Sequence, residues 1–162
     1  MRMGDEPPTF DEVYAAGYVD ITVQLFAYFN DRQEAQDVAQ EAFCRALAKW
    51  RSISRYDDPL AWIRRVAWNL AISRWRRGRT AMRFLHRQRV EEPYLDGPDP
   101  DRVMLFAALA KLPAAQRRVV VLRYLADLTV PEIADREGVP EGTVKTWLHR
   151  ARTELAEKVD HE

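Results

Sequence analysis

The chain has 162 residues and carries 25 basic and 25 acidic side chains, so its formal net charge is zero. A hydrophobic content of 47% is enough for packed cores, which excludes a disordered chain and fits one ordinary domain or two small helical domains. The single cysteine, Cys44, excludes an internal disulfide, and the three histidines have no metal-ligand spacing with it, so we expect no metal and no cofactor.

The N-terminal segment does not resemble a signal peptide, because residues 1–12 are acidic and lack an apolar core. No apolar run in the chain approaches the length that spans a bilayer. We therefore expect a cytoplasmic protein that does not insert into membranes.

Charge is segregated along the chain, which the total of zero hides. Residues 1–50 carry four basic and nine acidic groups, whereas residues 51–90 carry eleven basic and two acidic groups. Residues 91–110 are acidic again, with one basic and five acidic groups. The basic block favours contact with a phosphate backbone, although a basic run is often only a solvated face.

Helix-forming residues with a 3.6-residue periodicity dominate the N-terminal half, without convincing strand alternation. The pattern predicts helices over residues 10–29, 31–50 and 59–77, and the proline at the start of the third suits a first helical turn. The segment 76–90 either prolongs the third helix or forms a short extra one.

Residues 91–101 combine prolines, a glycine and acidic groups without periodicity, which is typical of a linker. This segment divides the chain into a domain over residues 10–90 and a second domain over residues 102–159. Helical patterns continue through the second domain. The expected fold is therefore all-α, with two small helical domains joined by a flexible linker.

The helix over residues 31–50 has an apolar stripe, which we assign to the core, and a polar face opposite it. Asp37, Gln40, Glu41 and Cys44 share this polar face at spacings of three and four residues. Taken alone, the patch is typical of a surface that faces solvent. Two carboxylates also suit acid-base catalysis, but no histidine, nucleophile or glycine loop accompanies them, so we do not expect an enzyme.

The helix from residue 59 buries an apolar stripe, and its opposite side is unusual for a solvated surface. Aromatic and cationic groups interleaved on one face suit unstacked bases and a single-stranded backbone. Tryptophan is more often a core residue than a ligand contact, so packing against the preceding helix is the alternative for the aromatic group. The basic block around this face favours nucleic acid. The residues assigned to the outward side are Trp62, Arg65, Asn69, Ile72 and Arg76.

Residues 128–155 predict two short helices around a tight turn. Thr129 and Glu132 have the spacing of a capping box at the start of the first helix. Gly138 suits the end of that helix, and Pro140 favours the first turn of the next one. This is the pattern of a DNA-reading helix-turn-helix, and the alternative is an ordinary helical hairpin with a solvated face.

The second helix of this motif has an apolar stripe at Val144, Leu148, Ala151 and Leu155, with Trp147 at its edge. The opposite face is polar and basic, as needed to reach base edges or phosphates in a major groove. That face consists of Thr143, Lys145, Thr146, His149, Arg150, Arg152 and Thr153.

Three segments, in this order, resemble bacterial RNA polymerase sigma factors of the sigma-70 family, of the extracytoplasmic-function (ECF) type. Residues 37–50 (DVAQEAFCRALAKW) are similar to the family's region 2.2, and residues 59–77 are similar to its regions 2.3 and 2.4. Residues 112–152 resemble region 4. The resemblance covers nearly the whole chain, and three motifs in order are more specific than one helix-turn-helix.

The resemblance implies roles that the residues alone leave open. Asp37, Gln40 and Glu41 match the family's face for the clamp helices of the polymerase β′ subunit. The helix from Gly142 to Arg152 matches the reader of the −35 promoter element, with Thr143, Lys145, Thr146, His149, Arg150 and Arg152 as its contacts. The loop 51–58 and the outward face of the following helix match the elements that capture flipped bases of the −10 strand, at Arg55, Tyr56, Trp62, Arg65, Asn69 and Arg76.

The implied partners are core RNA polymerase, through its β′ clamp helices and β flap, promoter DNA, and an anti-sigma factor as a further candidate. Trp147 departs from the family's pattern, since arginine is frequent there, and it either packs or contacts DNA. The alternatives are a helix-turn-helix repressor or activator that does not dock on polymerase, and a protein-interaction module. The patch at Asp37, Gln40 and Glu41 discriminates among these, because a repressor has no use for it.

Overall fold

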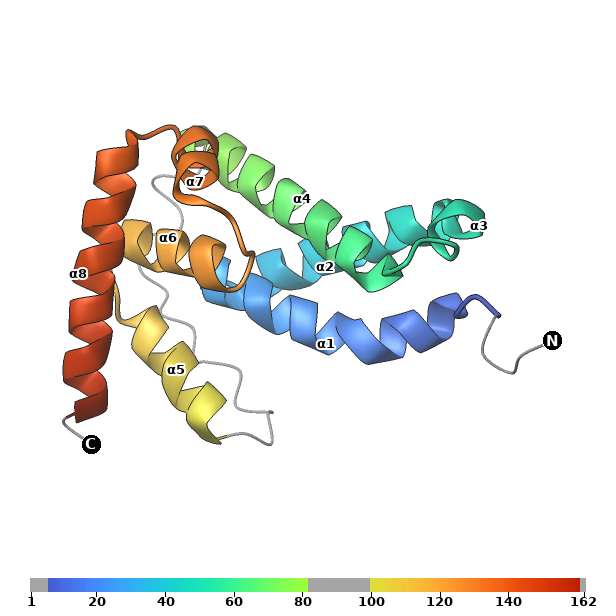
Figure 1. The fold of residues 1–162 in the computed structure, drawn as a ribbon, viewed down its shortest axis with the longest axis horizontal. Helices are drawn as coiled ribbons and strands as arrows, with labels where there is room; N and C mark the ends of the chain where they lie inside the picture. Colours follow the sequence, from blue (N-terminus) through green and yellow to red (C-terminus); the bar gives the residue numbers. More distant parts are fainter. Residues whose placement is uncertain (1–5, 82–99, 161–162) are drawn as a thin grey trace.

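The computed structural model describes residues 6–81 and 100–160, and these residues form eight helices with no strand among them (Figure 1). The all-α prediction is therefore confirmed. Residues 82–99, which contain most of the predicted linker and the end of the basic block, lie outside the described residues.

The N-terminal half begins with two antiparallel helices, α1 (Phe10–Phe29) and α2 (Arg32–Ala48). Asn30 ends α1 in the left-handed conformation, with a φ of 51°, and reverses the chain. The carboxylate of Asp31 then caps α2 by accepting a hydrogen bond from the backbone N–H of Glu34 at 3.1 Å. The predicted helix over residues 31–50 is shorter than expected, because the backbone leaves helical geometry at Lys49, and a separate turn of helix, α3 (Trp50–Ile53), follows.

Helix α4 (Pro59–Ala81) is four residues longer than its sequence pattern predicts. Residues 78–81 of the basic segment therefore continue this helix. Asp58 caps it by accepting a hydrogen bond from the N–H of Ala61 at 3.0 Å. The C-terminal half contains α5 (Pro100–Ala110), α6 (Ala114–Tyr124), α7 (Val130–Glu137) and α8 (Glu141–Asp160).

Helices α1, α2 and α4 pack together as a bundle. At Gly17 the bundle is tight, because a Cβ added to this residue would overlap the Leu60 side chain of α4. The apolar stripe predicted for residues 31–50 is confirmed as core within α2, where Ala35, Val38, Ala39, Ala42, Phe43 and Ala46 are all buried. Trp50, the last residue of that stripe, lies in α3 and is half-buried.

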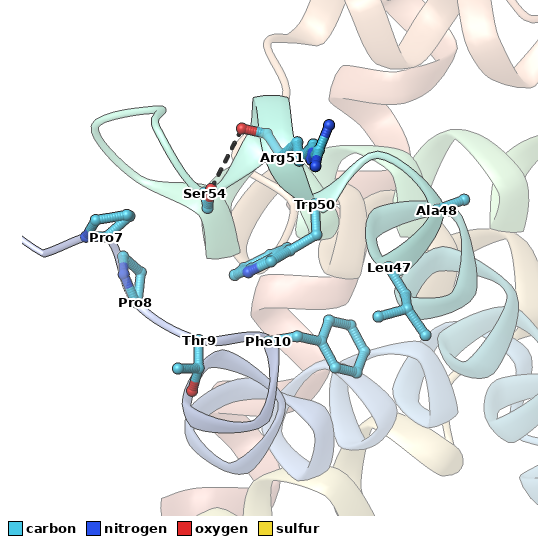
Figure 2. A pocket seen from close by; sticks show the side chains of 9 residues that line it. All are labelled: Pro7, Pro8, Thr9, Phe10, Leu47, Ala48, Trp50, Arg51 and Ser54. Atoms are coloured by element: carbon cyan, nitrogen blue, oxygen red, sulfur yellow. Dashed lines mark hydrogen bonds between the residues drawn. The ribbon is translucent and has the colours of Figure 1, made fainter.

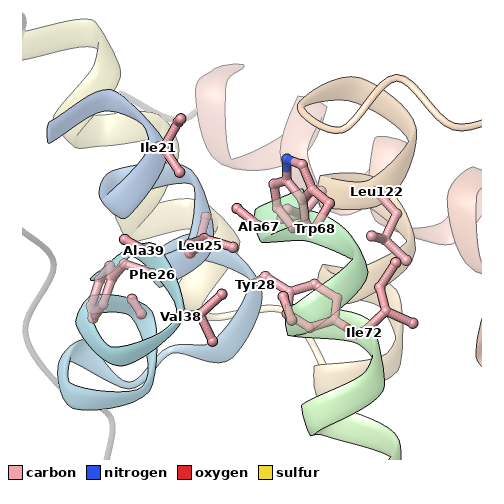
Figure 3. Close-up of a cluster of buried hydrophobic side chains, with 14 of the residues drawn as sticks. Ile21, Leu25, Phe26, Tyr28, Val38, Ala39, Ala67, Trp68, Ile72 and Leu122 are labelled. Carbon is pink, nitrogen blue, oxygen red and sulfur yellow. The ribbon is translucent and has the colours of Figure 1, made fainter. Parts of the chain in front are cut away.

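The two halves of the chain share one hydrophobic core. Helix α6 packs against α1, and α7 lies against α4 near the C-terminal end of that helix (Figure 1). Tyr28, Trp68 and Ile72 from the N-terminal half belong to the same buried cluster as Leu122 of α6 (Figure 3). None of the described helices is both long enough and apolar enough to cross a bilayer.

Candidate nucleic-acid interface

The helix-turn-helix forms as the sequence predicts. The Thr129 hydroxyl accepts from the backbone N–H of Glu132 at 3.3 Å, and the Glu132 carboxylate accepts from the Thr129 N–H at 3.3 Å and from its hydroxyl at 2.9 Å. These bonds lower the pKa of Glu132, and the charges of Arg136 and Arg65 lower it further. Gly138 ends α7 with a φ of 69°, a left-handed conformation that costs glycine little.

Helix α8 turns its apolar stripe inward. Val144, Leu148 and Ala151 are buried, and Leu155 is half-buried. Trp147 is also half-buried and packs against the core, so it belongs mainly to the packing side of the helix. Of the residues expected to contact duplex DNA, Thr143 is half-buried and the others are exposed, namely Lys145, Thr146, His149, Arg150 and Arg152.

Hydrogen bonds within the C-terminal half hold part of the polar face of α8 in place. The Thr146 hydroxyl donates to the Gly142 carbonyl at 2.9 Å, which commits its proton and leaves its oxygen as an acceptor. The Arg152 Nε donates to the Tyr124 hydroxyl at 2.7 Å, and the guanidinium carbon lies 5.6 Å from the centroid of that ring. Sequence reasoning missed Tyr124, because nothing in its local pattern shows that the end of α6 lies beside α8.

The expected strand-binding face of α4 is only partly open. Arg65, Asn69 and Arg76 are exposed, and Trp62 is half-buried against the core. The prediction for Ile72 was wrong: only 2% of its surface is exposed. It was assigned to solvent from the periodicity of one helix, but the C-terminal half packs over this part of α4 and shares a core with it.

The loop before α4 presents Arg55, which is exposed, and Tyr56, whose surface is 48% exposed. A pocket of about 510 Å³ lies next to this loop, between the start of α1 and the α2–α3 junction (Figure 2). Phe10 and Trp50 supply aromatic walls, and Arg51 supplies a positive charge. An aromatic and basic lining suits an unstacked base.

The polar patch on α2 is partly tied to its surroundings. Gln40, Glu41 and Cys44 are exposed and Asp37 is half-buried. One oxygen of Asp37 accepts from Gln33 Nε2 at 2.7 Å, and the other lies 3.4 Å from Arg74 Nη2 on α4. Arg74 also pairs with Glu34 at 2.7 Å, and Glu41 pairs with Arg45 at 2.8 Å. The patch is thus a set of carboxylates already oriented by neighbouring donors.

A polar cluster is buried where the two halves meet. The Tyr28 hydroxyl donates to Glu137 Oε1 at 3.1 Å, and Arg118 Nε lies 3.4 Å from Glu137 Oε2. The Arg118 guanidinium carbon lies 4.1 Å from the centre of the Trp75 ring. Burial, together with the Glu137 charge, raises the pKa of Tyr28 well above its usual value, whereas burial beside Arg118 lowers the pKa of Arg117 to about 10.

Two family models match the chain: Sigma-70 region 2 over residues 20–81, and Sigma-70, region 4 over residues 102–155. The RNA polymerase sigma-E factor of Streptomyces coelicolor is 35% identical to the chain over 131 residues, which cover 80% of this chain and 73% of the relative. The ECF RNA polymerase sigma factor SigW of Bacillus subtilis is 32% identical over 179 residues, covering 98% and 92%. The chain belongs to the ECF sigma factors of the sigma-70 family.

This ECF sigma factor acts in transcription initiation, and the reading as a repressor or activator is not favoured. Its α2 and α4 fall within the match to region 2, and α6, α7 and most of α8 fall within the match to region 4. The sigma factor RpoE of Bartonella quintana, solved in complex with the anti-sigma factor NepR, shares the fold with a TM-score of 0.57 at 22% identity, covering 93% of this chain and 96% of that one.

Proposed function

We propose that this sigma factor docks on core RNA polymerase through the patch of Asp37, Gln40 and Glu41 on α2. The observation that carries the proposal is the position of this patch opposite the buried stripe of α2, with Gln40 and Glu41 exposed. Carboxylates and an amide in a row offer charge-assisted and neutral hydrogen bonds to a partner helix. The proposed partner surface is the clamp-helix pair of the β′ subunit.

The second part of the proposal concerns the −10 element. Melting exposes bases that have lost their stacking energy, and the protein must offset that cost by stacking and phosphate contacts. Arg55 and Tyr56 in the loop, with Trp62, Arg65, Asn69 and Arg76 on α4, supply aromatic surface, an amide and three guanidinium groups for this purpose. The pocket beside the loop adds a place for one flipped base.

The third part concerns the −35 element, which α8 reads in the major groove. Its donors and acceptors are of the kinds that pair with base edges and phosphates. They are the half-buried Thr143 and the exposed Lys145, Thr146, His149, Arg150 and Arg152. The buried apolar stripe on the other side of α8 sets the direction in which these polar side chains point.

The remaining parts of the proposal follow from this role. Residues 10–90 form the docking and melting domain, residues 91–101 the linker, and residues 102–159 the −35 domain, which also meets the β flap. An anti-sigma factor is a further proposed partner. The Bartonella RpoE, which shares the fold, was solved in complex with one. The protein makes and breaks no covalent bond itself, and it works in the cytoplasm where the polymerase is.

Run-off transcription with purified core polymerase and a promoter library tests the proposal. We expect promoter-specific transcripts with the wild-type chain and none with core polymerase alone. A variant with Glu41→Arg should lose both holoenzyme assembly and transcription, whereas Glu157→Ala, an exposed change on α8 outside the proposed contacts, should retain both. Binding to duplex promoters without any transcript would instead favour a regulator that does not dock on polymerase.

A further inference from the structure

One arginine of α4, Arg74, reaches two carboxylates on the docking side of α2. Its Nε lies 2.7 Å from Glu34 Oε2, and its Nη2 lies 3.5 Å from Glu34 Oε1. The same Nη2 lies 3.4 Å from Asp37 Oδ2. Two contacts with one carboxylate fix the plane of a guanidinium group. Arg74 is therefore anchored by Glu34 and directs a second donor at Asp37.

The distances show that the two carboxylates use this guanidinium differently. The 2.7 Å contact with Glu34 is a strong charge-assisted bond, whereas the 3.4 Å contact with Asp37 is a weak one. The other oxygen of Asp37 accepts from Gln33 Nε2 at 2.7 Å. Both oxygens of Asp37 are thus directed by donors, but Oδ2 keeps a lone pair for a bond from a partner. Because 39% of the Asp37 side chain is exposed, a partner can reach it.

The acidic side chains on this side of α2 repel one another and need cations between them. Glu34, Asp37 and Glu41 follow at spacings of three and four residues, which bring side chains together on one face of a helix. Glu41 pairs with Arg45 of its own helix at 2.8 Å, whereas Glu34 and Asp37 draw on Arg74 of α4. Without Arg74, repulsion from both neighbours would favour rotamers of Asp37 that turn away from the row.

We propose that Arg74 is a positioning residue for polymerase docking: anchored by Glu34, it holds the Asp37 carboxylate ready for a donor of the partner helix. The inference rests on the proposed function, since that assigns Asp37 to the docking patch. A carboxylate that is already ordered loses less rotamer entropy when the partner binds. Arg74 and Glu34 act through Asp37 and do not touch the polymerase. The docking patch is thus built by two helices, and its geometry depends on how α2 packs on α4.

Positioning and net charge predict opposite effects for the loss of Arg74. Glu34, Asp37 and Arg74 carry two negative charges and one positive charge, so removing Arg74 makes the patch more negative. If charge alone mattered, a cationic partner would then bind more tightly. Loss of Arg74 also frees Asp37 to rotate, which weakens docking. We expect the second effect to dominate, because solvent screens charges on side chains as exposed as these, at 37% for Arg74 and 39% for Asp37.

Two substitutions separate these effects in the full-length chain. Arg74→Met keeps the length of the stem and removes the charge and the donors, whereas Arg74→Lys keeps the charge but lacks the planar fork that joins two carboxylates. Both should weaken assembly with core polymerase roughly two- to tenfold, mainly through faster dissociation, because short-range contacts form after the encounter. Arg77→Met is the matched control, since it removes the same groups from an exposed position about one turn further along α4, and it should bind like the wild type. Biolayer interferometry with the immobilised chain and core polymerase measures both rate constants.

A double-mutant cycle tests whether Arg74 acts through Asp37. In an Asp37→Ala background, Arg74→Met should have no further effect on the dissociation rate. Glu34→Gln should weaken assembly of the otherwise wild-type chain by a smaller factor, because it loosens the anchor of Arg74, and it too should have no effect in that background. An effect of Arg74→Met that persists undiminished without Asp37 overturns the inference, since Arg74 would then contact the polymerase directly.

The remaining outcomes separate this inference from the proposed function. Urea unfolding of each variant first establishes that the chain is folded. If Glu41→Arg abolishes assembly while folded Arg74→Met binds as tightly as the wild type, or more tightly, the positioning role is wrong and the docking patch stands. If Glu41→Arg, Asp37→Ala and Arg74→Met all assemble normally, the docking patch is itself wrong.

Discussion

Arg152 of α8 donates a hydrogen bond to the hydroxyl of Tyr124 at the end of α6, at 2.7 Å. Two guanidinium carbons lie near the ring of Tyr124, that of Arg152 at 5.6 Å and that of Arg123 at 5.9 Å from its centroid. Arg123 in turn reaches the Leu128 carbonyl just before α7, at 3.4 Å. Tyr124 thus connects the arginine proposed to contact the −35 element with the start of the helix-turn-helix, and we predict that it acts as a positioning residue.

Tyr124→Phe should weaken binding to the −35 duplex about two- to tenfold at fixed salt, because Arg152 loses the bond that orders its guanidinium. Isothermal titration or anisotropy with the duplex measures the change. In an Arg152→Ala background the same substitution should have no further effect, since a positioning role acts only through Arg152. An undiminished loss in that background would show that the hydroxyl matters for another reason.

Arg150→Ala should weaken binding to the −35 duplex by roughly 1–3 kcal/mol if this side chain reads a base, and the loss should fall mainly on one position of the site. Arg150 is exposed on α8. Binding measured against a set of single-position duplex variants separates base reading from a phosphate contact, which would weaken all sequences alike. Unchanged affinity at moderate salt would remove Arg150 from the proposed contacts.

Asp37→Ala should impair assembly with core polymerase and leave the fold intact. Asp37 is half-buried and its bonds to Gln33 and Arg74 lie near the surface, so we expect the free energy of unfolding to fall by no more than about 1 kcal/mol. Glu41→Arg should impair assembly more, because it reverses a charge. Gel filtration with core polymerase measures assembly, and urea unfolding measures the free energy of unfolding. Normal assembly by folded variants would refute the docking role.

Trp62→Ala should reduce promoter opening more than closed-complex formation, because an aromatic ring that stacks on a base is needed only after melting. Permanganate footprints on the −10 region measure opening, and duplex binding measures the closed complex. Since Trp62 is half-buried against the core, Trp62→Phe serves as the control that keeps most of the packing. Identical footprints for wild type and Trp62→Ala would contradict the assignment.

The capping box predicts a pH-dependent contribution from Glu132. Bonds from Thr129 lower the pKa of Glu132 from its ordinary 4.5, so the folded chain gains stability above pH 4.5 and loses it as the pH falls through the lowered pKa. Thr129→Ala should cost about 1 kcal/mol at pH 7. Thermal unfolding at pH 7 and pH 3 should show a smaller difference from the wild type at pH 3. An equal difference at both pH values would exclude this linkage.

The sequence by itself determined the local structure, because each signal needs only a few neighbouring residues. Thr129 with Glu132 specified the start of α7, and Gly138 specified its left-handed end. The period of apolar residues specified the stripe of α2 and the inward side of α8. These features, with three motifs in order, were enough to predict an all-α sigma factor.

Only the tertiary structure decided which helix faces stay open, because that depends on contacts between residues far apart in sequence. Ile72 follows the period of an outward face, yet the C-terminal half buries it. The bond between Tyr28 and Glu137 joins residues 109 positions apart, and no periodicity within α1 or α7 encodes it. Helical periodicity gives the direction of a side chain around its own axis, whereas burial depends on what the rest of the chain packs against that side.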